Sequence, residues 1–180
     1  MRFIMLPAVC AVMLAGACAP ENRAPELTGP DQLVIPLFAA NGGAGHNFGT
    51  HLSNREEVPA NSSRAQGQAV FTLSADGLSL AYTLIVANIV DVTQSHIHMA
   101  PAGANGGIVA WLYPSAPPLQ LIPGRSQGIL GQGVITAANL VGALAGQTLQ
   151  DLLDAIAAGN TYVNVHTVQL PPGEIRGQID

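Results

Sequence analysis

Regular alternation of apolar and polar residues around an Asp-Gly pair constrains this chain more than any other feature of its sequence. On one side of an extended backbone, residues 78–86 place five apolar side chains: Leu78, Leu80, Tyr82, Leu84 and Val86. Residues 66–74 (QGQAVFTLS) alternate in the same way, and Ala75-Asp76-Gly77 separates the two runs. A period of two residues is that of a β-strand, and Asp-Gly favours a tight hairpin turn. The sequence therefore predicts an antiparallel hairpin over 66–86.

The chain beyond residue 86 contains more short runs of this kind, separated by Gly, Pro and Asn. We expect further strands at 93–98, 107–113, 128–135, 161–167 and 174–179. About eight strands with turn signals at this spacing predict an all-β fold, an antiparallel Greek-key sandwich or barrel.

One segment of the chain has the period of a helix instead. Residues 148–158 (TLQDLLDAIAA) repeat apolar side chains at helical spacing: Leu149, Leu152, Leu153 and Ile156. Thr148 is a suitable N-cap, and Gly159 is a suitable stop. We therefore expect one short helix in a late connection of the β fold.

The first 18 residues have the pattern of a secretion signal. Arg2 precedes an uncharged, mostly apolar run over 3–14, which is shorter than the roughly 20 residues that a membrane-spanning helix needs. The following Ala15-Gly16-Ala17-Cys18 resembles a bacterial lipoprotein signal, which implies that Cys18 is lipidated and becomes the first mature residue. The alternative is ordinary cleavage at a small-x-small site, with Cys18 removed or left free.

Residues 19–32 (APENRAPELTGPDQ) are polar and rich in proline, which is typical of a flexible tether. We therefore expect a β-domain over 33–180, exported to the periplasm or cell surface and anchored in the membrane through Cys18. Because Ala19 follows the cysteine, the pattern resembles outer-membrane lipoproteins if the host is diderm. The only other cysteine, Cys10, lies in the signal, so no intrachain disulfide is expected.

Charge excludes one class of partner. The net charge is −5, and the six basic residues, all arginines, form no cluster. Proteins that bind nucleic acids neutralise phosphates with clustered cations. We therefore expect no nucleic-acid partner.

Three histidines lie on polar faces of two expected strands. His96 and His98 are two residues apart and so share one face of the strand at 93–98, and His166 lies in the strand at 161–167. If these strands are neighbours, the three imidazoles converge. Imidazole is a ligand for zinc and copper, and three histidines leave one coordination position open. The sequence predicts one copper or zinc ion here; the alternative is structural histidines that hydrogen-bond to carbonyls or loop acids.

Nearby charged and aromatic residues are candidates for supporting roles. Glu174 and Arg176 are two apart in the last strand, so they can pair with each other or support a histidine. Glu57 is a second acid that can hydrogen-bond to a histidine ring. Trp111 and Tyr113 share a face of the strand at 107–113, where we expect them in the core. No nucleophile motif is present, so no catalytic residue is assigned.

Several motifs together resemble the CHRD domain, which is named from the secreted antagonist chordin and is common in bacterial exported proteins. The motifs are EEVP at 56–59, GQAVF at 67–71, SHIH at 95–98, PAGANGG at 101–107, YVNVHT at 162–167 and PGEIRGQ at 172–178. The resemblance covers roughly residues 38–180. It implies an extracytoplasmic β-domain and supplies no reaction.

The histidine spacing also resembles a second family, the copper–zinc superoxide dismutases, which are Greek-key barrels. That family takes copper ligands from an H-x-H strand and from a later strand, which implies copper at His96, His98 and His166. The chain has no match for the family's zinc ligands or disulfide. His46 and His51 are the remaining histidines, and neither is an assured fourth ligand.

These observations leave three functional hypotheses. The leading one is a binding module that holds copper or zinc for metal capture or tolerance at the cell envelope. The second is an adhesion or protein-interaction module, with structural histidines and an unidentified protein partner. The third is a redox enzyme similar to superoxide dismutase.

Overall fold

The computed structural model describes residues 47–180, which lie within one compact unit, Asn41–Asp180. The signal at 1–18 with Cys18, the tether at 19–32, His46 and the first part of the predicted domain at 33–180 fall outside the described residues. The expectations for those segments therefore stay predictions. No helix among residues 47–180 is long and apolar enough to cross a membrane.

The described chain is built from strands, with one α-helix. The strands are β1 (Asn47–Ser53), β2 (Gln66–Leu73), β3 (Leu80–Met99), β4 (Gly107–Tyr113), β5 (Ile122–Ile135), β6 (Thr161–Thr167) and β7 (Ile175–Gln178). Two short 3₁₀ helices, Ala137–Asn139 and Gly142–Leu144, precede helix α1 (Leu149–Ala157) in the connection from β5 to β6. The predicted all-β fold with one helix in a late connection is confirmed.

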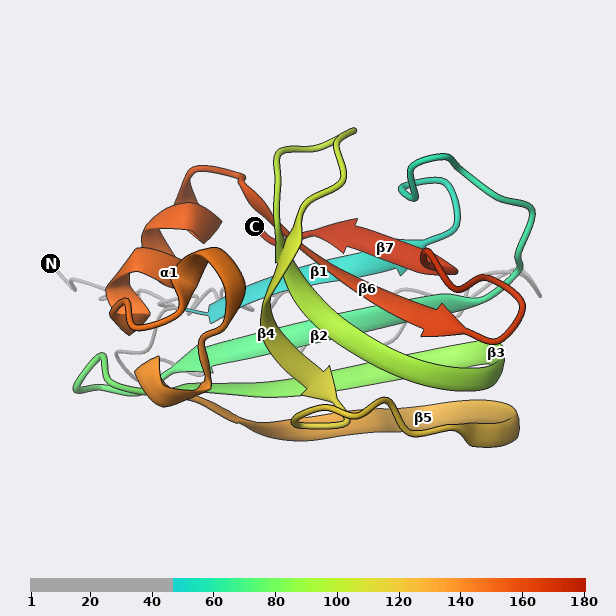
Figure 1. Cartoon of the computed structure of the whole chain (residues 1–180), viewed down its shortest axis with the longest axis horizontal. Coiled ribbons are helices and arrows are strands. Elements are labelled where there is room, and N and C mark those ends of the chain that lie inside the picture. Colours follow the sequence, from blue (N-terminus) through green and yellow to red (C-terminus); the bar gives the residue numbers. More distant parts are fainter. Residues whose placement is uncertain (1–46) are drawn as a thin grey trace, which may run out of the picture. The chain divides into compact units, whose positions relative to one another are not determined.

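The strands form one antiparallel sheet that closes into a barrel (Figure 1). The order is β2-β1-β7-β6-β3-β4, and β3 also pairs with β2. The path from β2 through β1, β7, β6 and β3 therefore returns to β2 and closes the barrel. The long strand β3 makes this possible because its first half pairs with β2 and β5 and its second half with β6 and β4. Register shifts along β3, and left-handed backbone at Asn88 and Asp91, accompany its bend.

Two differences from the predicted strands follow from this geometry. The runs at 78–86 and 93–98 belong to one strand, β3, and with the unpredicted β1 added the sheet has seven strands instead of about eight. Residues 87–92 contain neither glycine nor proline, and bulges turn the chain there without ending the strand. Strand β1 was missed because NFGTHLS lacks strict alternation. Strands β4 and β6 have the predicted bounds.

One apolar cluster fills the barrel and continues under α1. Its fully buried members come from several strands and include Leu52, Phe71, Leu80, Leu84, Ile97, Val163, Val165 and Ile175. The helix adds its predicted apolar face, Leu149, Leu152, Leu153 and Ile156. Thr148 caps the helix as predicted, with its hydroxyl accepting from the Asp151 amide, and Gly159 follows the end at φ +68°.

Candidate metal centre

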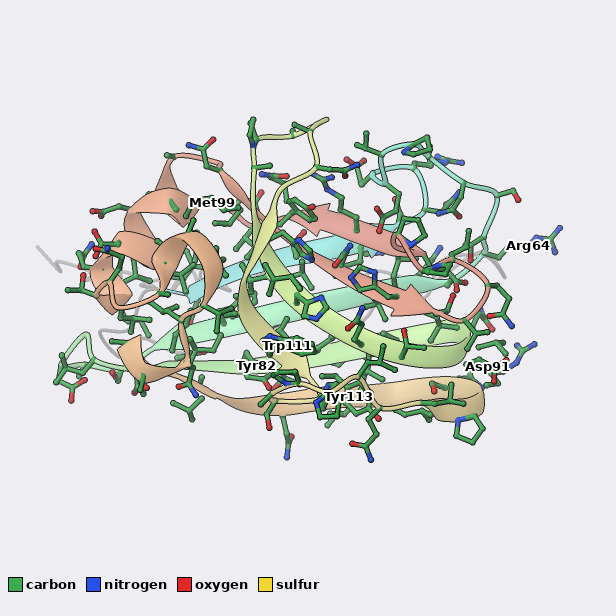
Figure 2. All side chains as sticks on the ribbon, in the orientation of Figure 1. Arg64, Tyr82, Asp91, Met99, Trp111 and Tyr113 are labelled. Carbon is green, nitrogen blue, oxygen red and sulfur yellow. The ribbon has the colours of Figure 1, made fainter. Side chains whose placement is uncertain are left out.

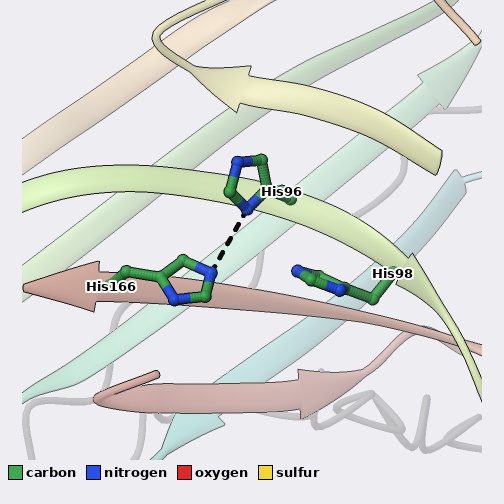
Figure 3. A group of neighbouring side chains, drawn as sticks. All are labelled: His96, His98 and His166. Carbon is green, nitrogen blue, oxygen red and sulfur yellow. Dashed lines mark hydrogen bonds between the residues drawn. The ribbon is translucent and has the colours of Figure 1, made fainter. Parts of the chain in front are cut away.

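The face of β3 and β6 opposite the core carries the three histidines. The strands are antiparallel neighbours, with His96 opposite Asn164 and Gln94 opposite His166. Ile97 points the other way, into the core, where it is fully buried. The two strands are therefore neighbours, which was the condition for convergence, and His96 and His98 of β3 lie beside His166 of β6 (Figure 3).

Loops and strand β4 cover this polar face, so the histidines are removed from solvent. Their exposed fractions are 0% for His96, 7% for His98 and 6% for His166. The glycine-rich loop between β3 and β4 is held down by Asn105, whose side-chain amide donates to the Val58 carbonyl at 2.8 Å. The ring centroids of His96 and Trp111 are 4.3 Å apart, edge to face.

Backbone carbonyls orient two of the three rings. His98 Nδ1 lies 2.9 Å from the Gly106 carbonyl oxygen, and His166 Nδ1 lies 2.8 Å from that of Pro171. A carbonyl oxygen only accepts hydrogen bonds, so each Nδ1 carries the proton of a neutral ring. Each Nε2 is therefore unprotonated and carries a lone pair, and His98 Nε2 has no hydrogen-bond partner although it is buried.

The third ring completes the group through its other nitrogen. His96 Nδ1 lies 3.2 Å from His166 Nε2. Figure 3 shows that Nδ1 of His96 faces the other two rings, whereas Nε2 of His96 points away from them. Because His166 Nε2 accepts, His96 Nδ1 donates in this state. To bind an ion through Nδ1, the neutral His96 ring moves its proton to Nε2.

The spacing of the nitrogens fits a small metal ion after a slight contraction. One nitrogen from each histidine lies within 4.8 Å of the others. A metal at roughly 2.0–2.1 Å from each nitrogen would hold them about 3.3–4.1 Å apart. Side-chain shifts of less than about 1 Å close the difference, which rotamer adjustment of the rings supplies.

Burial keeps the histidines neutral, which is the form that binds metals. It lowers the pKa of His96 to about 3, with smaller contributions from the charges of His166 and His98. Burial also lowers the pKa of His166 to about 4, against the raising effect of its bond to Pro171. The pKa of His98 is lowered by burial and then by the charge of Arg176, although the Gly106 carbonyl opposes this. At pH 7 a metal ion can therefore bind to these histidines without releasing a proton from them.

Comparison with known proteins agrees with the motifs that surround this site. The family model of the CHRD domain matches residues 48–179, which is nearly all of the described chain. This chain belongs to the CHRD-domain family. No curated protein and no solved structure has significant similarity to it.

The charged residues of this CHRD domain do not pair as expected. Glu174 accepts from Ser63 Oγ at 2.6 Å and from Thr167 Oγ1 at 2.7 Å, and it forms no hydrogen bond or ion pair with Arg176. Arg176 instead donates to carbonyl oxygens of the glycine-rich loop, as described below. The GEIRGQ motif is thus explained by two separate contacts: its acid holds the loop before β2, and its arginine holds the loop after β3.

Arg176 is part of a stack that ends on a histidine. Its guanidinium donates to the Ala104 carbonyl at 2.7 Å and to Asn105 Oδ1 at 3.2 Å. The guanidinium carbon lies 3.3 Å from the centroid of the Tyr162 ring. Tyr162 in turn stacks on His98, with centroids 4.9 Å apart and planes 9° apart. The stack holds the face of the His98 ring, whereas the Gly106 carbonyl holds its edge.

Glu57 lies near this arginine and not on a histidine. It is buried at 6% exposure, and its Oε1 has no hydrogen-bond partner. Burial raises the pKa of Glu57 to about 7, although the charge of Arg176 and a backbone hydrogen bond lower it. The carboxyl is therefore partly protonated at neutral pH. It contacts Gly173, where any side chain would collide with the carboxyl group.

Two aromatic residues at the site were not predicted from the sequence. Trp111 of β4, labelled in Figure 2, contacts His96 instead of belonging to the core cluster, whereas Tyr113 packs against that cluster as expected. Tyr162 shares a face with His166, and this alternation was the signal that could have identified it. His51 is exposed on β1 and does not belong to the group of three.

Proposed function

We propose that this CHRD domain is an extracytoplasmic binding module that holds one copper or zinc ion through His96, His98 and His166. The observation that carries the proposal is the convergence of three buried, neutral imidazoles whose nitrogens lie within 4.8 Å of one another. Imidazole nitrogens suit both metals. The role is metal capture or tolerance at the cell envelope.

The alternative, a protein-interaction module with structural histidines, explains the two bonds to carbonyls and the bond between His96 and His166. It leaves His98 Nε2 buried without a partner, which costs free energy unless an ion occupies the site. A metal gives this nitrogen a partner. His96 Nε2 is buried without a partner both with and without a metal, so the metal accounts for His98 Nε2 alone.

Metal analysis of the chain, purified without a polyhistidine tag, tests the proposal. We expect one equivalent of copper or zinc after loading and dialysis, and none in a variant with His96, His98 and His166 all changed to Ala. His51→Ala is the matched control, because His51 is exposed and outside the site. A well-folded protein that retains no metal contradicts the metal site and favours the interaction module.

The single tryptophan offers a second readout of the same site. Trp111 lies 4.3 Å from His96 between ring centroids, and the chain has no other tryptophan. Bound Cu²⁺ quenches nearby fluorophores, whereas Zn²⁺ has a closed d shell and does not. We expect stoichiometric quenching by copper that His166→Ala abolishes. Quenching that persists in this variant would place copper elsewhere.

Export and anchoring belong to the same proposal. The pattern of residues 1–18 supports a lipid anchor at Cys18, with 19–32 as the tether. In a bacterial host, we expect the chain to fractionate with membranes and Cys18→Ser to release it or leave it uncleaved. Recovery of the unchanged protein from the cytoplasm contradicts export. Export without a membrane association favours ordinary cleavage.

Copper in an open site would also permit redox chemistry, the third hypothesis. Its support is the resemblance of the histidine spacing to superoxide dismutases. A superoxide assay on the copper-loaded chain tests it, with the triple alanine variant as control. Equal activity of the two proteins contradicts this hypothesis and leaves metal binding unaffected.

A further inference from the structure

The three histidines have no anionic partner within their own ligand group. The group of potential ligands contains neither a carboxylate nor a thiolate among residues 47–180. Glu174, the acid in the nearby GEIRGQ motif, is turned to the hydroxyl groups of Ser63 and Thr167. A bound ion would therefore keep its full charge in a buried environment.

A buried positive charge reaches this group through the aromatic stack on His98. Arg176 is 1% exposed, and its guanidinium lies on the face of Tyr162, the ring that stacks on His98. Glu57 compensates this charge only in part, because burial raises the pKa of its carboxyl to about 7. Arg176 therefore opposes a cation at the histidines, and it opposes a divalent ion about twice as strongly as a monovalent one.

The number of ligands favours a monovalent ion, as the charge of Arg176 does. Three imidazoles are offered from two strands, in a site whose histidines are 0–7% exposed. At three imidazoles Zn²⁺ needs a water as its fourth ligand, for which a buried site must make room, and Cu²⁺ prefers tetragonal arrangements of four or more ligands. Cu⁺ has a closed d shell without such a preference and accepts three ligands. Asn164, beside His96 in the sheet, could add only an uncharged amide oxygen.

We propose that this site selects the monovalent cuprous ion over Cu²⁺ and Zn²⁺, and that Arg176 contributes to the selection through its buried charge. The inference rests on the proposed metal site and names the ion that it holds. The domain is then a carrier or store of Cu⁺, and Arg176 is a specificity-determining residue that touches neither the ion nor its ligands.

Competition with chelators tests the proposal on the full chain without a polyhistidine tag. Cu⁺ is buffered anaerobically with bicinchoninate, and Zn²⁺ and Cu²⁺ with chelators of known affinity. We expect the Kd of Cu⁺ to be at least about 100-fold below that of Zn²⁺, since both charge and ligand number disfavour the divalent ion. A Kd for Zn²⁺ or Cu²⁺ at or below that of Cu⁺ overturns the inference and leaves the metal site intact.

Two substitutions separate the charge of Arg176 from its packing. Arg176→Met removes the charge, whereas Arg176→Lys keeps it and loses the forked hydrogen bonds. For charges of the order of 10 Å apart at an effective dielectric constant of about 20, one extra unit of ion charge changes affinity about tenfold. We expect Arg176→Met to narrow the preference for Cu⁺ over divalent ions by about tenfold, and Arg176→Lys to preserve it.

The reduction potential of the bound copper gives an independent readout. A tenfold change between the two oxidation states corresponds to about 59 mV for one electron. We expect Arg176→Met to lower the potential by about this amount relative to the wild type. An unchanged potential and an unchanged preference overturn the role of Arg176. If Arg176→Met does not fold, the wild-type affinities test the selection of Cu⁺, and the reduction potential of Arg176→Lys tests the role of the charge. Loss of the preference for Cu⁺ over divalent ions in Arg176→Lys contradicts a charge effect. Failure to bind all three ions contradicts the metal site itself.

Discussion

Acidification should destabilise the metal-free protein through its buried histidines. Their folded pKa values, about 3 for His96 and about 4 for His166, lie well below the roughly 6.5 of an unfolded chain. Below pH 6.5 the unfolded chain therefore binds protons that the folded chain does not. The free energy of unfolding falls as pH falls, and the loss continues until the folded pKa values are reached.

The size of this effect follows from the linkage between protons and folding. Each such histidine costs about 1.4 kcal/mol per pH unit, so His96 and His166 together cost about 5 kcal/mol between pH 6.5 and 4.5. Glu57 acts in the opposite direction, because its pKa of about 7 lies above that of an unfolded glutamate. It offsets about 2 to 3 kcal/mol over this range. The lowered pKa of His98 adds to the loss, so a net decrease of at least about 2 kcal/mol is expected.

Urea unfolding of the chelator-treated chain, followed by Trp111 fluorescence from pH 7.5 to 4.5, measures the effect. His166→Gln should reduce the loss between pH 6.5 and 4.5 by about 2 to 3 kcal/mol, since glutamine does not titrate. His51→Ala, at an exposed position, should leave the loss unchanged. The reasoning is refuted if His166→Gln and the wild type lose the same free energy over this range.

Three further substitutions test the loop that orients His98, the buried acid Glu57 and the cap of α1. Gly106→Ala should weaken metal binding in a titration, because a Cβ there collides with the carbonyl of Met99 and displaces the oxygen that orients His98. Gly107→Ala meets open space and should bind metal normally in the same titration. Glu57→Gln should raise the free energy of unfolding by about 1 to 3 kcal/mol at pH 8 and by less at pH 5, because glutamine avoids the ionisation of a buried carboxyl whose pKa is raised. Equal increases at both pH values in urea unfolding would exclude this cause. Thr148→Ala should lower the free energy of unfolding by about 1 kcal/mol through loss of the helix cap, and an unchanged urea midpoint would contradict it.

Local patterns were sufficient to predict most elements of the fold. Strands β4 and β6 and helix α1 were predicted to within one residue, because period, cap and stop signals all lie inside each segment. The continuity of β3 could not be predicted in this way. Whether residues 87–92 turn or continue depends on their pairing with β5 and β6, which are far away in the sequence.

The three histidines of the candidate site were predictable, whereas their surroundings were not. Same-face spacing identified His96 and His98, and His166 needed only one assumption, that its strand is their neighbour. The role of Arg176 depends on which loop covers the face, and alternation within its strand carries no information about that. The pairing expected with Glu174 failed for this reason, since Ala104 and Asn105 supply acceptors from the other loop.

The way in which β3 pairs explains how one strand can serve both the core and the site. On the β6 side the register is continuous from Gln94 to Met99, so His96 and His98 keep a common face while Ile97 stays in the core. On the β4 side the register shifts at both histidines, and Trp111 comes to lie against His96. A regular partner therefore aligns the ligands, and an irregular partner closes over them. Because burial by this cover is the main cause of the lowered pKa of all three histidines, the same packing that makes the site ready for a metal makes the metal-free fold sensitive to acid.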